Sequence, residues 1–122
     1  MKKEKEEFPL HELGVVIRVI ETVEKVVLDN QLTKVEAIIL QIGELSSMIP
    51  SYVEACYPAA VYRSSLKETK LKIEILKAHG KCRPCGKVFQ VVTEDGICPE
   101  CGEKDFDLIS GREFMIKEIV AY

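Results

Sequence analysis

The chain has 122 residues, of which 47% are hydrophobic and 30% are charged, and its formal net charge is −3. This length and composition allow one hydrophobic core with a small satellite module. Lysine and glutamate are interspersed, so no basic stripe for nucleic acid is expected. No apolar run is long enough to cross a bilayer and no secretory signal pattern opens the chain, so we expect a cytoplasmic protein without a membrane partner.

The first part of the chain predicts a tail followed by an amphipathic helix. Residues 1–9 are rich in lysine and glutamate and lack an apolar face, so we expect a flexible N-terminal tail. Beyond Pro9, apolar residues recur at steps of three and four, which predicts a helix over 11–29 that packs on a sheet. Its apolar stripe consists of Leu13, Val16, Ile17, Ile20, Val23 and Val27.

Three later segments predict the strands of one sheet. Residues 35–42 are rich in β-branched side chains and are apolar on both faces, which suits a central strand covered by helices. Residues 70–75 alternate lysine or glutamate with leucine or isoleucine, the pattern of a half-exposed strand. The apolar run over 114–120 predicts the third strand.

A second helix is expected between the first two strands. Pro50 suits the first turn of a helix, and an apolar stripe follows it: Val53, Cys56, Tyr57, Ala60 and Val61. Pro58 lies inside this pattern and predicts a bend. Because Cys56 falls on the stripe, we expect it in the core and not in a metal site.

Four cysteines form two C-x-x-C pairs, each followed by a glycine. Cys82 and Cys85 make the first pair, and Cys98 and Cys101 make the second, with twelve residues between the pairs. Each pair sets two thiolates on one tight turn, and the following glycine can take the positive φ that directs backbone N–H groups at the sulfurs. The pattern predicts a site of four thiolates, which we interpret as structural zinc.

Two alternatives to zinc stay open at this point. A pair of disulfides would need an oxidising compartment, and the chain has no recognisable export signal. An iron centre of the rubredoxin type fits the segment from Cys98 to Gly102. Against iron, the chain has no tryptophan and few aromatic residues near the cysteines in sequence to shield a redox centre.

The order of these segments defines the expected architecture. We expect an α/β protein with an approximately three-stranded sheet and two helices, plus an inserted zinc-ribbon lobe. The ribbon domain is predicted at 79–108, and the α/β domain at 10–78 together with 109–122. Gly80 and Gly111 lie at the two connections and are expected to permit hinge motion.

The chain has few candidate catalytic residues. The chain has two histidines, His11 and His79, and it has neither a glycine-rich phosphate loop nor a Ser-His-Asp order. A zinc ion saturated by four thiolates has no open position for water, so we expect a protein that is not an enzyme. On the residues alone, His11 is a helix-entry residue, Glu12 suits the positive end of the helix dipole, and His79 has no assigned role.

Four motifs follow one another in a characteristic order. Leu10-His11-Glu12-Leu13 opens the first helix, Ile42-Gly43-Glu44-Leu45-Ser46 follows the first strand, and Ser110-Gly111-Arg112-Glu113, after the two cysteine pairs, precedes the last strand. In this order and approximate spacing they resemble the HypA/HybF family over about residues 10–121. The resemblance implies a nickel metallochaperone for maturation of [NiFe]-hydrogenase, and in some organisms of urease. It also implies a structural zinc, transient Ni(II), and partners that include the GTPase HypB and other hydrogenase maturation proteins.

The resemblance also implies a nickel site at the start of the first helix. In the family, nickel is held by the α-amine, backbone amide nitrogens and a histidine, which gives His11 as imidazole ligand here and Glu12 as the neighbour that supplies an amide nitrogen or a carboxylate. Nine residues precede Leu10, which occupies the place of the initiator methionine. Three alternatives follow: weaker nickel binding through His11 and another side chain, removal of the tail, or a zinc-ribbon adaptor that binds a protein without labile nickel.

Overall fold

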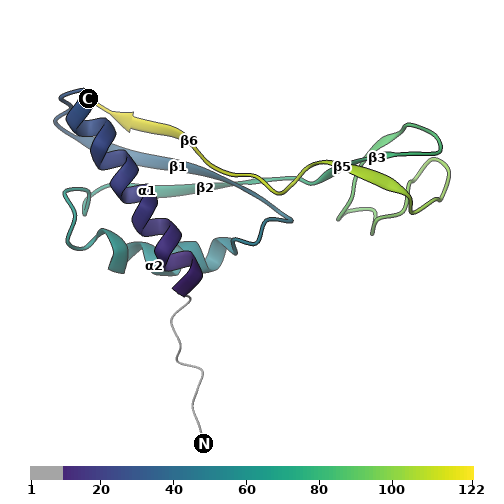
Figure 1. Cartoon of the computed structure of the whole chain (residues 1–122), viewed down its shortest axis with the longest axis horizontal. Helices are drawn as coiled ribbons and strands as arrows, with labels where there is room; N and C mark the ends of the chain where they lie inside the picture. Colours follow the sequence, from purple (N-terminus) through teal and green to yellow (C-terminus); the bar gives the residue numbers. More distant parts are fainter. Residues whose placement is uncertain (1–9) are drawn as a thin grey trace, which may run out of the picture. The chain divides into compact units, whose positions relative to one another are not determined.

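The computed structural model describes residues 10–122, so the predicted tail at 1–9 lies outside the described residues (Figure 1). In chain order the elements are α1 (Leu10–Asp29), β1 (Val35–Gly43), α2 (Pro50–Val61), β2 (Lys70–Leu76), β3 (His79–Cys82), β4 (Val88–Gln90), β5 (Phe106–Ser110) and β6 (Phe114–Ala121). No helix in this described range is long and apolar enough to cross a membrane.

The strands form two three-stranded sheets, with the orders β2-β1-β6 and β4-β3-β5. The strands β3, β4 and β5, with the cysteines around them, come between β2 and β6 in the sequence. The α/β fold class with two helices, a small sheet and an inserted four-cysteine module is therefore confirmed.

The described residues divide into two compact units. One, which we call the helical unit, takes 10–40, 48–73 and 116–122, and the other, the cysteine unit, takes 41–47 and 74–115. The predicted ribbon domain at 79–108 lies inside the cysteine unit, which also contains the segments on either side of it and the turn after β1.

The core of the helical unit comes from α1, α2 and β1, and the two helices contact each other. On β1, Ala37 and Ile38 are consecutive and both buried. Because consecutive strand residues point to opposite faces, both faces of β1 are covered, as the sequence predicted for a central strand. The helices contribute Val16, Val19, Ile20, Val23, Val53, Cys56 and Val61 to the buried set.

One part of the predicted α1 stripe is wrong. Ile17 is 39% exposed, whereas Val19, which was not on the predicted stripe, is buried. Each of residues 16, 19, 20 and 23 lies three or four positions from two of the others, so the four share one face, while residue 17 lies about 100° around the helix from residue 16. Cys56 is fully buried, as predicted for a core cysteine.

Three chain segments of the cysteine unit meet at one closely packed point, which we call the crossing: 43–45, 76–79 and 110–113. A Cβ atom at Gly43 would lie 2.1 Å from the carbonyl oxygen of Gly111, and a Cβ atom at Gly111 would lie 2.5 Å from the Cβ of Ala78. Gly111 also has a φ of 125°, which side chains rarely adopt. The crossing therefore requires glycine at both positions.

Backbone and carboxylate hydrogen bonds hold the crossing together. The N–H of Gly43 donates to the carbonyl of Glu113 at 2.7 Å, and the N–H of Leu45 donates to the carbonyl of Gly111 at 2.7 Å. The carboxylate of Glu44 accepts the N–H of Ala78 at 3.0 Å, and that of Glu113 accepts the N–H of Gly111 at 2.7 Å. Hydrogen bonds from the backbone N–H groups of Glu113 itself and of Gly111 lower the pKa of the Glu113 carboxyl.

The close packing argues against the hinge that the sequence suggested. Gly80 is buried in β3, where a Cβ atom would lie 2.6 Å from the ring of Phe106 and 2.8 Å from Val91. Gly111 is buried in the crossing. Both glycines therefore allow close approach of neighbouring groups, and neither lies in an open connection.

Candidate metal centres

The antiparallel strands β3, β4 and β5 position two tight cysteine turns. In the first turn the N–H of Gly86 donates to the carbonyl of Cys82 at 2.8 Å, and in the second the N–H of Gly102 donates to the carbonyl of Cys98 at 2.8 Å. Gly86 and Gly102 have φ values of 79° and 78°. The predicted left-handed glycine after each cysteine pair is thus confirmed.

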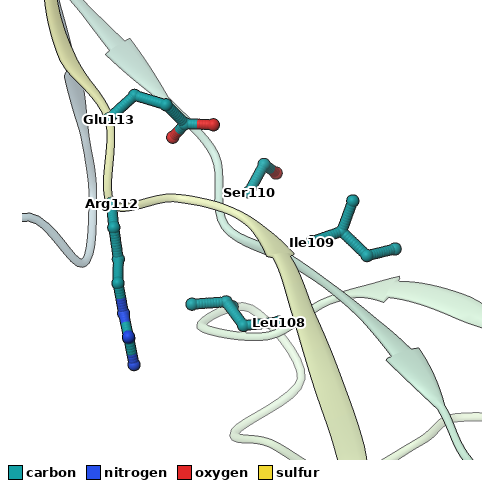
Figure 2. Close-up of a pocket in the computed structure, with 5 residues that line it drawn as sticks. All are labelled: Leu108, Ile109, Ser110, Arg112 and Glu113. Atoms are coloured by element: carbon teal, nitrogen blue, oxygen red, sulfur yellow. The ribbon is translucent and has the colours of Figure 1, made fainter.

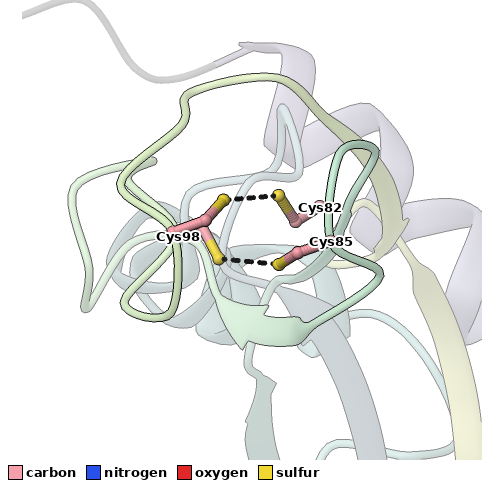
Figure 3. Close-up of side chains that lie close together, drawn as sticks. Cys82, Cys85 and Cys98 are labelled. Carbon is pink, nitrogen blue, oxygen red and sulfur yellow. Dashed lines mark hydrogen bonds between the residues drawn. The ribbon is translucent and has the colours of Figure 1, made fainter.

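The two turns bring the four cysteines together, and Figure 3 labels three of them, Cys82, Cys85 and Cys98. The Sγ atoms of Cys82 and Cys101 are 3.5 Å apart, those of Cys85 and Cys98 are 3.6 Å apart, and all four lie within 4.8 Å of one another. A disulfide would need about 2.05 Å, and all five cysteines are free, so the disulfide alternative is wrong. Four thiolates around an ion at about 2.3 Å would lie roughly 3.8 Å apart, which agrees with these separations.

The pKa values of the cysteine thiols differ because their surroundings differ. Burial opposes ionisation of Cys98, but hydrogen bonds from the backbone N–H groups of Cys101 and Glu100 outweigh it and lower its pKa to about 7. Burial raises the pKa of Cys82 to about 12, in spite of a hydrogen bond from the backbone N–H of Cys85. The backbone of the second turn therefore favours the thiolate form of Cys98, which is the form that binds metal.

Two aromatic rings pack beside the cysteines, which the sequence did not lead us to expect. Phe89 and Phe106 meet edge-on with centroids 5.6 Å apart, and both contact the cluster that contains Cys82 and Cys98. The scarcity of aromatic residues was our sequence argument against iron, and the structure removes it. The four-sulfur geometry itself suits zinc or iron.

An arginine in the first cysteine turn forms hydrogen bonds with two aspartates that follow the second cysteine turn. Arg83, which lies between Cys82 and Cys85, donates through Nε and Nη2 to Asp107 at 3.0 and 2.6 Å and through Nη1 to Asp105 at 2.8 Å. Sequence reasoning missed this clamp, although the alternation of two aspartates at the start of β5 gave a signal for it.

His79 is held in one orientation by Ser110. The Ser110 hydroxyl lies 3.2 Å from the carbonyl of Lys77, to which it can donate. It lies 3.2 Å from the backbone nitrogen of His79 and 3.1 Å from its Nδ1. Ser110 therefore fixes the orientation of the His79 ring through its Nδ1 atom.

His11 and Glu12 lie on the first turn of α1 and face different environments. The side chain of His11 is exposed, whereas Glu12 is 5% exposed and its Oε2 accepts the N–H of Ile49 at 3.4 Å, just before α2. Burial, and then the charge of Glu12, raises the pKa of the Cys56 thiol. Within the described residues only the four cysteines form a cluster of three or more potential metal ligands, so His11 belongs to no such cluster.

A sequence profile described as "Hydrogenase/urease nickel incorporation, metallochaperone, hypA" matches residues 10–121. The chain belongs to the HypA family. This is a family of metal-incorporating maturation factors and not a family of enzymes, and its members act in the maturation of hydrogenase.

Individual HypA proteins are similar over most of the chain. The hydrogenase maturation factor HypA of Geotalea uraniireducens is 37% identical, over 70% of this chain and 78% of that protein. The HypA of Geobacter metallireducens is 34% identical, over 90% of this chain and 97% of that protein. The solution structure of the Ni metallochaperone HypA from Helicobacter pylori covers 90% of this chain and 96% of its own, with 26% identity and a TM-score of 0.61. A second HypA solution structure has 27% identity and a TM-score of 0.67, over 93% of this chain and 97% of its own.

Proposed function

We propose that this chain is a cytoplasmic nickel carrier that takes up Ni(II) at His11 and Glu12. It delivers the ion to a partner protein during the maturation of [NiFe]-hydrogenase or of urease. A HypB-type GTPase is the proposed immediate partner, and Cys82, Cys85, Cys98 and Cys101 hold a separate structural Zn(II). The observation that carries the proposal is the exposed imidazole of His11 on the first turn of α1.

The first turn of α1 suits a nitrogen-donor site. The first four N–H groups of an α-helix have no acceptor within the helix, so the amide nitrogens of His11 and Glu12 are not engaged in the α1 ladder. Ni(II) favours a square-planar arrangement of nitrogen donors, which an imidazole and neighbouring amides can supply. An exposed site also allows uptake and transfer to another protein.

The burial of the Glu12 carboxylate supports separate roles for this carboxylate and for the backbone amide nitrogen of Glu12. Its side chain is directed at the N–H of Ile49, the N-cap residue of α2, whose own side chain makes no capping hydrogen bond. We therefore assign the carboxylate to holding the first turn of α1 in place, and the amide nitrogen of Glu12 to nickel. On this basis Glu12→Gln, which retains an acceptor for Ile49, keeps nickel binding, whereas Glu12→Ala weakens it.

Metal analysis of the purified chain tests the proposal. We expect one zinc per chain, and one further Ni(II) when the protein is titrated with nickel and followed by calorimetry. His11→Ala should abolish nickel uptake and leave the zinc content unchanged. His79→Ala is the matched control because it removes the other histidine, and it should bind nickel as the wild type does. Unchanged nickel affinity in His11→Ala would show that the carrier site lies elsewhere.

The same titration, run on chains that start at Met1 and at Leu10, shows whether residues 1–9 weaken nickel binding. Stronger nickel binding by the shorter chain would support a terminal amine as an additional donor, since an α-amine loses its proton more readily than a peptide nitrogen. Iron in the metal analysis, accompanied by visible colour, would contradict zinc at the four cysteines.

A further inference from the structure

The end of β5 borders a hollow in the cysteine unit of about 390 Å³. It is lined by Leu108, Ile109, Ser110, Arg112 and Glu113. Figure 2 shows the chain bending at Ser110, with the side chains of Leu108 and Arg112 both on the concave side of the bend. An apolar side chain and a cation thus flank the same space.

The strand beside this hollow has an open edge. β5 is an outer strand in the order β4-β3-β5. The N–H of Arg83 donates to the carbonyl of Asp105, and the register continues through Lys81 opposite Asp107 to Gly80 opposite Leu108. Because hydrogen-bonded and non-bonded pairs alternate in an antiparallel ladder, Leu108 is in a non-bonded pair and directs its N–H and C=O away from β3.

The opposite side of the ladder agrees with this assignment. On β3, Gly80 lies opposite Phe89 of β4. Backbone hydrogen bonds join the pairs two positions to either side, from the N–H of Cys82 to the carbonyl of Lys87 and from the N–H of Val91 to the carbonyl of Ala78, so the pair of Gly80 and Phe89 is also a hydrogen-bonded one. Gly80 therefore uses its backbone groups towards β4, and its partner Leu108 cannot receive them. The same alternation directs the N–H and C=O of Phe106 outwards, so the edge offers two donors and two acceptors, from Phe106 and Leu108 with one residue between them.

Two side chains of opposite charge line the hollow, those of Arg112 and Glu113. The carboxylate of Glu113 is bound by the N–H of Gly111 at 2.7 Å, and its pKa is lowered by backbone N–H groups. Arg112 is exposed, and no described residue forms an ion pair or hydrogen bond with its side chain. Among the described residues, the anion of Glu113 is therefore held by backbone N–H groups, while the guanidinium of Arg112 remains available to a carboxylate next to an apolar side chain.

We propose that β5 binds an extended segment of a partner protein as an added strand, with a carboxylate of that segment on Arg112. The segment pairs with the outward groups of Phe106 and Leu108, and an apolar side chain two residues from the carboxylate lies against Leu108. This interaction surface goes beyond nickel carriage and needs no nickel. Its test is therefore run on zinc-loaded protein, where failure of the nickel proposal has no effect on the result.

The test is selection from a library of random octapeptides with free carboxyl ends. Wild-type protein should enrich peptides that combine an acidic side chain or the terminal carboxylate with an apolar residue. Amidating the C-terminus of enriched peptides then tells the two carboxylate sources apart. Arg112→Glu should weaken binding of these peptides tenfold or more, whereas Arg18→Glu, the same charge change on α1, should leave it unchanged. Peptide-induced amide shifts in NMR spectra should be concentrated at residues 105–113.

A second variant addresses the backbone pairing. Leu108→Pro removes the outward N–H while the inward bonds of Asp107 remain, and it should lose peptide binding. If this variant does not fold, the comparison of Arg112→Glu with Arg18→Glu decides whether the proposal holds. The proposal is overturned if no peptide is enriched over the Arg112→Glu protein, or if shifts map away from β5. It is equally overturned if sedimentation shows that β5 is covered by a second copy of the chain.

Discussion

A single added methyl group at Gly43 tests the crossing directly. The Cβ of Gly43→Ala would lie 2.1 Å from the carbonyl oxygen of Gly111, and Gly43 itself has no positive φ that would strain alanine. The expected damage therefore comes from packing alone. A carbon and an oxygen need roughly 3.3 Å, so the two segments must separate by about 1 Å.

The magnitude follows from what that separation disturbs. Forcing a methyl group into a closely packed site costs about 1–3 kcal/mol. The two bonds at 2.7 Å that join Gly43 to Glu113 and Leu45 to Gly111 would lengthen, and each contributes about 1 kcal/mol. Loss of freedom in the unfolded chain returns about 0.4–1 kcal/mol to the alanine variant. We expect a net loss of about 3 kcal/mol.

Urea unfolding of the zinc-loaded protein measures this loss. With a slope of about 2 kcal/mol per molar urea, the midpoint should fall by about 1.5 M. Gly14→Ala is the matched control because nothing lies within 4 Å of its added Cβ on α1, and it should stabilise the protein by about 0.5–1 kcal/mol. Equal midpoints for Gly43→Ala and the wild type would refute the crossing as described.

Three further predictions concern the turns, the crossing and the metal. Gly102→Ala should weaken zinc binding about tenfold in competition with a chromophoric chelator, because alanine at a φ of 78° costs about 1–2 kcal/mol; Gly102→Asn should lose less, and equal affinity for all three proteins would contradict the strain argument. Backbone hydrogen bonds lower the folded pKa of Glu113, so its contribution is present above the unfolded value of about 4.5 and is lost as the pH falls through the folded pKa. Wild-type urea midpoints should therefore fall more steeply between pH 6 and pH 3 than those of Glu113→Gln, and parallel curves would count against these bonds. Removing zinc with a chelator should abolish hydrogen-exchange protection at Gly86 and Gly102 while Ile38 on β1 stays protected, and simultaneous loss at all three amides would mean that the metal stabilises the whole chain.

The parts that the sequence predicted well depend on local patterns. The period of α1 and the apolar run of β1 are contained in their own segments, so their extents are close to those predicted. The cysteine turns were predictable for the same reason, since C-x-x-C-G encodes both the ligands and the left-handed glycine. Ile17 was misplaced because the edge of a helical stripe depends on which neighbours cover it.

The parts that were not predicted depend on contacts between distant segments. The carboxylate of Glu44 accepts the backbone N–H of Ala78, which lies 34 residues further along the chain. The short strands β3, β4 and β5 carry too few residues for a periodic signal. Nothing in the sequence near Phe89 or Phe106 indicates that their rings pack against the sulfurs.

The crossing also bears on how much variation the metal module can accept. Gly43, Ala78 and Gly111 fix the points at which the chain enters and leaves the module, and Val91 packs against the cysteine cluster. The exposed segment 92–95 between the cysteine turns is therefore a loop with fixed ends. Lengthening a loop with fixed ends costs only about 0.6 kcal/mol for each doubling. Insertions there, including grafted recognition sequences, should leave the ligand cage intact, while a one-residue deletion at the entry would displace it.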